Sequence, residues 1–139
     1  MKRSIQKVAV LGSGVMGSRI ACHFANIGVQ VLLLDIVPKE ADNSKKSRNK
    51  IVDDALAFAL KSNPSPIYKK SFASRITTGN FEDNMAQIAD CDWIIEVVVE
   101  RLDIKKVIFE QVEKYRKPGI MINFFLLLSL SVLCSHSNC

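Results

Sequence analysis

Cysteine is scarce in this sequence, and no two cysteines stand in a C-x-x-C spacing: four occur in 139 residues. Cys22, Cys91, Cys134 and Cys139 therefore provide no redox pair, and we expect reduced thiols. Cys134 and Cys139 lie near His136, but a fourth ligand is lacking, so we expect no metal site. A secretory signal is also lacking, since the N-terminal residues lead directly into an expected strand. This pattern predicts a cytoplasmic protein.

Signatures of RNA or DNA binding are lacking too, although the net charge is +5. The basic residues are spread along the chain, and the largest group consists of Lys45, Lys46, Arg48 and Lys50. This group fits a solvated helix face or, alternatively, a patch that binds phosphate groups. With 48% apolar and 24% charged residues, the composition is that of one folded globular domain.

Charged side chains are absent from residues 120–139, while residues 1–119 hold all 19 basic and 14 acidic ones. We therefore expect the folded domain in 1–119, followed by an atypical uncharged hydrophobic tail. The tail fits a truncation or frameshift product, a membrane anchor, or the last strand of a short module. Its apolar core, Ile120 to Cys134, is shorter than the roughly 20 residues of a membrane span. We do not expect a membrane protein.

Alternating apolar runs and helical patterns predict an α/β fold. Residues 8–12 form a continuous apolar run, as expected for a strand buried on both faces, and residues 29–35 (VQVLLLD) are the second expected strand. Between them, Gly28 ends a helix. The apolar stripe of that helix consists of Met16, Ile20, Phe24 and Ile27. A strand, a helix and a strand at this spacing form a βαβ unit, whose two strands are parallel.

A helical hairpin is expected over residues 39–75, after the second strand. Its first arm has apolar residues at Ile51, Ala55, Phe58 and Ala59, and the prolines of NPSPI end it. A strand over 75–79, a short helix over 81–90 and a strand over 91–99 then resume the α/β pattern. A final helix ends at Pro118-Gly119. Its inward side is expected to hold Ile104, Val107, Ile108, Val112 and Tyr115.

Three glycines, Gly12, Gly14 and Gly17, stand between the first strand and its helix. In a G-x-G-x-x-G turn the first glycine allows a sharp turn, the second lets the backbone approach a pyrophosphate, and the third allows close helix packing. The free N–H groups of the helix start then face the pyrophosphate. Ser13, Val15 and Met16, which lie between the glycines, would contribute backbone groups. The alternative is a glycine turn that binds nothing.

Asp35 ends the second strand, 23 residues after Gly12. An acid at this place accepts hydrogen bonds from both ribose hydroxyls and repels a 2′-phosphate, which favours NAD over NADP. The strand, the turn, the helix and the acid together predict a dinucleotide site. His23 lies on the same helix, where we expect an ordinary helix residue and not a general base.

The stretch VAVLGSGVMGSRIACHFANIGVQVLLLD, joined to CDWIIEVVVERLDIKKVIFEQVEKY, resembles the NAD-binding domain of the 3-hydroxyacyl-CoA dehydrogenases. The G-x-G-x-M-G form and the phrase D-x-I-I-E-x-x-x-E-x-x-x-x-K are typical of that family. The resemblance runs from Lys7 to Gly119. It implies a Rossmann-type, doubly wound, mostly parallel sheet with the helical hairpin as an insertion. It also implies NAD as cofactor and, for the family, oxidation of 3-hydroxyacyl-CoA to 3-oxoacyl-CoA in fatty acid β-oxidation.

Residue roles follow from the resemblance. The three glycines would line the pyrophosphate and Asp35 would hold the adenosine ribose, while Glu100 and Lys105 would lie near the nicotinamide ribose. Glu96 also matches the family phrase, either as a ligand contact or as a residue that shapes the strand end. The hairpin lies near the CoA moiety in this family, which makes an acyl-CoA substrate the expected partner of a whole enzyme.

The sequence departs from the family after residue 119. Phe124 occupies the place of a serine that binds the substrate oxygen, and the catalytic histidine of the family has no counterpart, since His136 comes too early. We therefore assign no catalytic residue and expect little or no activity from this chain alone. The alternative function is a non-catalytic module that binds NAD or a partner.

Overall fold

A five-stranded parallel sheet forms the centre of the computed structural model, which describes residues 4–98 and 102–124. The strands are β1 (Lys7–Leu11), β2 (Gln30–Asp35), β3 (Ile76–Asn80), β4 (Trp93–Glu96) and β5 (Met121–Phe124). Their order across the sheet is β3-β2-β1-β4-β5. The chain thus runs outward from β1 to β3 and then returns to the other side of β1 for β4 and β5. This confirms the predicted doubly wound parallel fold.

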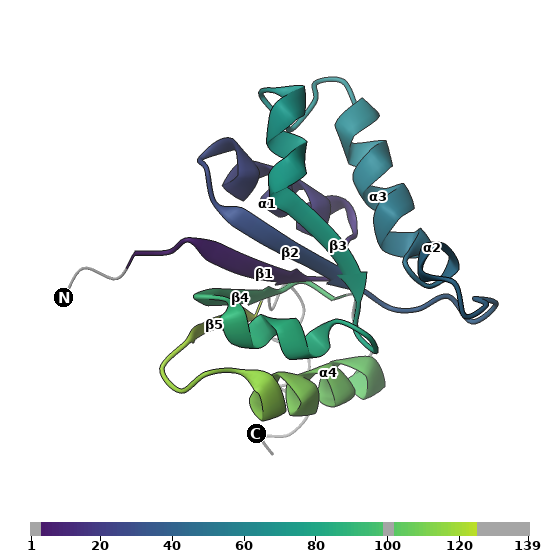
Figure 1. Cartoon of the computed structure of the whole chain (residues 1–139), viewed down its shortest axis with the longest axis vertical. Helices are drawn as coiled ribbons and strands as arrows, with labels where there is room; N and C mark the ends of the chain where they lie inside the picture. Colours follow the sequence, from purple (N-terminus) through teal and green to yellow (C-terminus); the bar gives the residue numbers. More distant parts are fainter. Residues whose placement is uncertain (1–3, 99–101, 125–139) are drawn as a thin grey trace, which may run out of the picture.

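Helices cover both faces of the sheet, with α1 and α3 on one side and α4 on the other (Figure 1). The α-helices are α1 (Val15–Asn26), α2 (Lys45–Arg48), α3 (Lys50–Lys61) and α4 (Leu102–Tyr115), and two short 3₁₀ helices are η1 (Lys70–Arg75) and η2 (Met85–Asp90). In the described part of the chain, no helix is long and apolar enough to cross a membrane.

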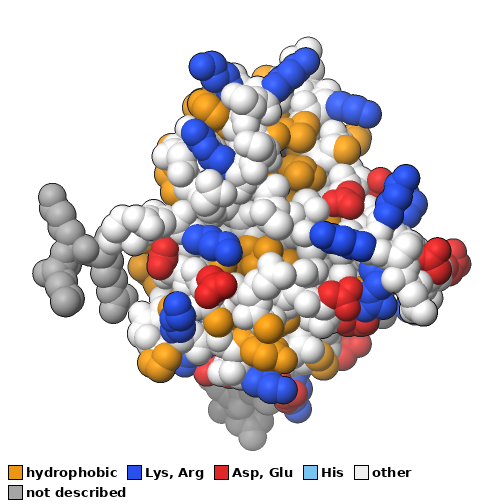
Figure 2. Space-filling view, viewed as in Figure 1, with side chains coloured by type: hydrophobic (Ala, Val, Ile, Leu, Met, Phe, Trp, Pro, Cys, Tyr) orange, Lys and Arg blue, Asp and Glu red, His pale blue; other side chains and the backbone are white. Residues whose placement is uncertain are grey.

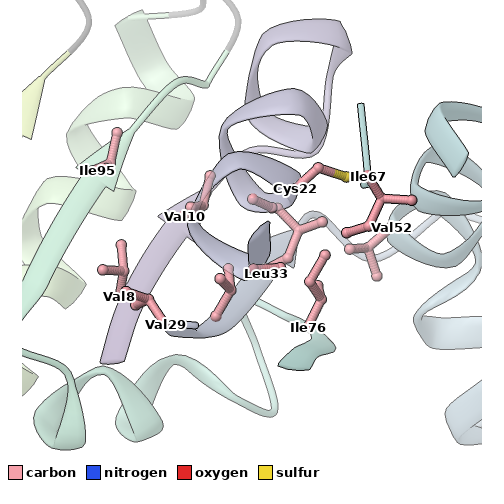
Figure 3. Packing of buried hydrophobic residues seen from close by; sticks show 12 residues of the cluster. Val8, Val10, Cys22, Val29, Leu33, Val52, Ile67, Ile76 and Ile95 are labelled. Atoms are coloured by element: carbon pink, nitrogen blue, oxygen red, sulfur yellow. The ribbon is translucent and has the colours of Figure 1, made fainter. Parts of the chain in front are cut away.

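Successive residues of each strand point to opposite faces and so build two separate cores. On the side of α1, Val10 and Leu33 pack with Cys22 of α1 and Val52 of α3, as Figure 3 shows. On the side of α4, the intervening strand residues pack with Ile108 and other apolar residues of α4 and η2. Apolar runs without polar alternation are therefore required in β1 and β2, because both faces of these strands are covered.

The buried face of α1 differs from the predicted apolar stripe. Small residues are buried there, namely Gly17, Ser18, Ala21, Cys22 and Ala25. Of the predicted stripe, Ile20 and Phe24 are partly buried, whereas Met16 is 41% and Ile27 is 73% exposed. The prediction was wrong for these two residues because α1 lies so close to the sheet that small side chains fill the contact.

The helical insertion is also built differently from the predicted hairpin. Asn49 separates the short α2 from α3, and the second arm is the 3₁₀ helix η1. Within α3 the buried residues are Val52 and Ala59, while the side chain of Phe58 is 75% exposed. In α4 the predicted inward face is confirmed at Ile104, Ile108, Val112 and Tyr115, but Val107 is 55% exposed.

The last two strands differ in extent from the predicted elements. β4 covers only Trp93–Glu96 of the predicted strand over 91–99. β5 pairs with β4 in parallel, with Trp93 opposite Met121. β5 thus lies inside the range that the sequence analysis assigned to the uncharged tail, and the rest of that tail, residues 125–139, lies outside the described residues.

Two free cysteines lie in the cores, Cys22 and Cys91. Burial raises the pKa of the Cys91 thiol to about 11 and raises that of Cys22 as well. Because alkylating agents attack the thiolate, we expect iodoacetamide near neutral pH to leave both cysteines unmodified in the folded protein and to label both after denaturation. Peptide mass spectrometry measures this. Equal labelling of either one in both states would contradict the packing.

Candidate functional site

The glycine turn connects β1 to α1 at the carboxyl edge of the sheet. Gly12 has a φ of 110°, a left-handed conformation that favours glycine, and a Cβ there would lie 2.9 Å from the Val97 carbonyl oxygen. A Cβ on Gly17 would overlap the carbonyl oxygen of Gly12. A Cβ on Gly14, by contrast, would meet no atom within 4 Å. Two glycines therefore serve packing, and the backbone of Gly14 faces open space.

Hydrogen bonds hold this turn on both sides. The Gly12 amide donates to the carbonyl of Leu34 at 2.7 Å, which ties the turn to β2. The Ser18 hydroxyl donates to the Ser13 carbonyl, also at 2.7 Å. Ser13 and Ser18 are each 2% exposed. The turn thus has a defined shape before any ligand binds.

Asp35 lies at the end of β2, beside this turn. Its Oδ2 accepts hydrogen bonds from the Ser13 amide at 2.7 Å and from the Ser13 hydroxyl, and its Oδ1 accepts from the Ile36 amide at 2.7 Å. The structure thereby brings the predicted acid next to the predicted turn. The sequence pattern predicts only a backbone role for Ser13, and no sequence signal marks the hydroxyl contact.

The start of α1 fits an anionic group. Gly14 is the N-cap, no side chain caps the helix, and its first turn holds no acidic residue. Val15 and Met16 lie on this turn with exposed side chains, at 74% and 41%. The first backbone N–H groups of a helix have no partner within the helix and carry the positive end of its dipole. With the open space at Gly14, these residues fit the pyrophosphate of a dinucleotide.

The end of β4 lies on the other side of β1 and carries a second acid. Glu96 is 4% exposed, and its Oε1 accepts a hydrogen bond from the Val98 amide at 2.7 Å. Burial raises the pKa of Glu96, whereas the Val98 hydrogen bond and the nearby charge of Lys105 act to lower it. Lys105, on the first half of α4, therefore lies near this acid. The predicted site residue Glu100 lies outside the described residues.

A cleft runs from the glycine turn between α1 and α3. Its walls hold apolar and charged side chains of both helices, and they consist of Ser13, Gly14, Val15, Ser18, Arg19, Asp54, Ala55, Phe58, Ala59 and Ser62. The exposed ring of Phe58 on α3 and the exposed side chain of Val15 on α1 belong to this lining. The helical insertion after β2 thus provides one wall of a cleft that opens at the candidate nucleotide site.

Half of the predicted basic cluster is engaged by acids. Arg48 forms salt bridges with Glu82 at 2.6 Å and Asp83 at 2.7 Å, and Lys50 pairs with Asp54. The Arg48 hydrogen bond holds the pKa of Asp83 below its usual range. Lysine and arginine side chains are spread over the face in Figure 2, with acidic ones among them. Of the four residues, only Lys45 and Lys46 remain candidates for a phosphate contact.

A hydrogen bond between two asparagines holds the helical insertion beside Asp35. Asn80, which is opposite Asp35 in the register of β2 and β3, donates to Asn49 at 2.7 Å. Both asparagines are buried, and the Asn80 amide also donates to Asp83, at 3.0 Å. This polar contact sets the position of α2 and α3 relative to the end of β2.

Comparison with known proteins agrees with this geometry. A family model described as "3-hydroxyacyl-CoA dehydrogenase, NAD binding domain" matches residues 7–123. The chain belongs to this family. NAD is accordingly the cofactor of the domain, and the parallel sheet with its glycine turn is the Rossmann-type fold that the resemblance implied.

Two bacterial relatives of this chain are each named "Probable 3-hydroxyacyl-CoA dehydrogenase". The Bacillus subtilis protein is 45% identical over an alignment of 133 residues that covers 88% of this chain and 17% of the relative. The Deinococcus radiodurans protein is 40% identical over 119 residues, 86% of this chain and 33% of the relative. The chain thus spans a third or less of the length of these relatives.

Solved structures share the fold. A 3-hydroxybutyryl-CoA dehydrogenase from Escherichia coli is 26% identical, with a TM-score of 0.58, over 88% of this chain and 25% of that one. The dehydrogenase part of a multifunctional enzyme from Caenorhabditis elegans has a TM-score of 0.62 at 18% identity, over 98% of this chain and 30% of that one. The second likeness concerns the fold alone.

Gly14 and Gly17 form a matched pair for a test. Gly17→Ala should lower the free energy of unfolding by at least about 2 kcal/mol, because the new methyl group overlaps the backbone of Gly12. Gly14→Ala should leave stability nearly unchanged, since the methyl group meets open space, yet weaken NAD binding roughly tenfold or more through crowding of the ligand. Denaturant unfolding and calorimetry measure the two effects. A Gly14→Ala protein destabilised as much as Gly17→Ala would contradict the open space, because loss of the glycine N-cap alone costs less.

Glu96 should make stability depend on pH. Its pKa is raised in the folded protein, so the folded state holds the proton more tightly than the unfolded chain. The Glu96 contribution to the free energy of unfolding must then fall as pH rises through the ordinary glutamate pKa of about 4.3 and up to the raised value. As pH rises from about 4, the wild type should therefore lose stability relative to Glu96→Gln. Chemical unfolding measures this, with the exposed Glu110→Gln as control. A constant difference would contradict the raised pKa.

Proposed function

We propose that this chain supplies the nucleotide-binding part of an NAD-dependent 3-hydroxyacyl-CoA dehydrogenase that oxidises 3-hydroxyacyl-CoA to 3-oxoacyl-CoA in fatty acid β-oxidation, in the cytoplasm. The observation that carries the proposal is the contact of the Asp35 carboxylate with a glycine turn whose middle glycine faces open space. The names of the relatives support the reaction. Bound NAD would accept the hydride, and the residues of this chain would bind and orient it.

The pyrophosphate would lie on the turn from Gly12 to Gly17. Gly14 supports this because its backbone is open to approach, while Gly12 and Gly17 let the turn and the helix lie close together. The backbone amides of Val15 and Met16 would complete the contact, whereas the Ser13 amide already donates to Asp35. An uncapped helix start with no acid in its first turn attracts a doubly charged group.

The adenosine ribose would bind to Asp35. This carboxylate is held beside the turn by backbone amides of Ser13 and Ile36, so its position is set before ligand binding. A negative charge at this place disfavours the 2′-phosphate of NADP. Beyond the end of β4, Lys105 of α4 would approach the nicotinamide ribose together with Glu100. The nearness of Lys105 to Glu96 supports its place at this edge of the sheet.

An acyl-CoA substrate would use the cleft between α1 and α3. Its apolar lining, with Val15 and Phe58, suits the pantetheine chain, and the exposed Lys45 and Lys46 at the start of α2 suit a phosphate. Arg48 is excluded from that role, because Glu82 and Asp83 already bind its guanidinium.

The test is calorimetric titration of the chain with NAD and with NADP. We expect NAD to bind and NADP to bind more weakly. Asp35→Ala should weaken NAD binding by about 1–3 kcal/mol, because the ribose hydroxyls lose a charged acceptor. Asp90→Ala, an exposed acid on η2, serves as control and should bind as the wild type does. Equal affinity of the Asp35→Ala and wild-type proteins would refute the ribose role of Asp35.

A further inference from the structure

Three protein donors converge on the Asp35 carboxylate, and two of them come from Ser13. The Ser13 amide donates to Oδ2 at 2.7 Å, the Ser13 hydroxyl donates to the same oxygen, and the Ile36 amide donates to Oδ1 at 2.7 Å. The Ser13 carbonyl in turn accepts from the Ser18 hydroxyl at 2.7 Å. Ser13 is therefore held at each of its polar groups, and two of these groups hold Asp35.

The hydroxyl of Ser13 is the side-chain member of this set, and its exposure of 2% excludes most competing water. A hydrogen bond to an ionised carboxylate is shorter and stronger than one between neutral groups. A carboxylate with hydrogen bonds on both oxygens cannot rotate freely about its last side-chain bond. Such pre-organisation lowers the entropy lost when a ligand binds.

We infer that the Ser13 hydroxyl is a positioning residue of the nucleotide site, which sets the orientation of the Asp35 carboxylate toward the two hydroxyls of the adenosine ribose. This inference rests on the proposed NAD binding and gives a side-chain function to a residue whose backbone groups are bonded to Asp35 and Ser18. Glycine or alanine in place of Ser13 would leave the turn and the acid intact but would remove one of the two bonds on Oδ2.

A direct contact of the hydroxyl with the pyrophosphate is the competing role for Ser13. The two roles differ in what they depend on. A positioning hydroxyl acts through Asp35 and matters only for ligands that carry ribose hydroxyls. A hydroxyl that binds the pyrophosphate acts without Asp35 and matters equally for ligands without them. A double-mutant cycle separates the two.

The experiment measures NAD affinity by calorimetry for the wild type, Ser13→Ala, Asp35→Ala and the double variant. Loss of one hydrogen bond should raise the Kd of Ser13→Ala roughly 3- to 10-fold, and the double variant should bind no more weakly than Asp35→Ala. ADP and 2′,3′-dideoxyadenosine 5′-diphosphate serve as further probes. Ser13→Ala should weaken binding of ADP and leave binding of the dideoxy compound unchanged.

Denaturant unfolding of each variant, with Ser71→Ala as an exposed-serine control, shows that the fold is kept. The inference is overturned if Ser13→Ala binds NAD as the wild type does, if its loss persists in the Asp35→Ala background, or if the dideoxy compound is affected as strongly as ADP. Failure of the wild type itself to bind NAD would refute the proposed function and the inference with it. That outcome is distinct, because it appears before any variant is compared.

Discussion

The close approach of α1 to the end of β1 is the constraint on which the nucleotide site depends. Gly17 lies against the carbonyl of Gly12, and no side chain larger than hydrogen fits between them. This contact brings the start of α1 to the carboxyl edge of the sheet, where the N–H groups of the helix face the open space at Gly14. It also explains why α1 buries small residues such as Ala21 and Ala25 against the strands. A larger side chain in place of Gly17 would push α1 away from Gly12 and disrupt the turn.

Two acids, at the ends of the strands on either side of β1, have different surroundings. Asp35 is partly exposed and accepts hydrogen bonds from the turn, so it stays available to a ligand. Glu96 is almost fully buried, and its carboxylate accepts a hydrogen bond from the Val98 amide just after β4. One carboxylate is therefore partly exposed beside the glycine turn, and the other is buried at the end of β4.

Much of the fold was predictable from local patterns, and the errors in helix burial have one physical cause. The apolar runs of β1 and β2 predicted buried parallel strands, and Gly28 predicted the end of α1; its φ of 89° agrees. The burial of Met16, Ile27 and Val107 was predicted wrongly, since periodicity shows that a helix has an apolar face but not how close that face lies to the sheet. The distance between elements decides which side chains are covered.

The sequence by itself determined the strand–turn–helix–strand unit, the three glycines and the acid at the end of β2, because each depends on residues close together in the chain. The tertiary structure alone decided which groups meet. In the folded protein the Ser13 hydroxyl donates to Asp35, and Arg48 forms salt bridges with Glu82 and Asp83. The space beside Gly14 stays open. These contacts join segments about 20 to 35 positions apart, and such distances in the chain become contacts only when the sheet and its helices pack together.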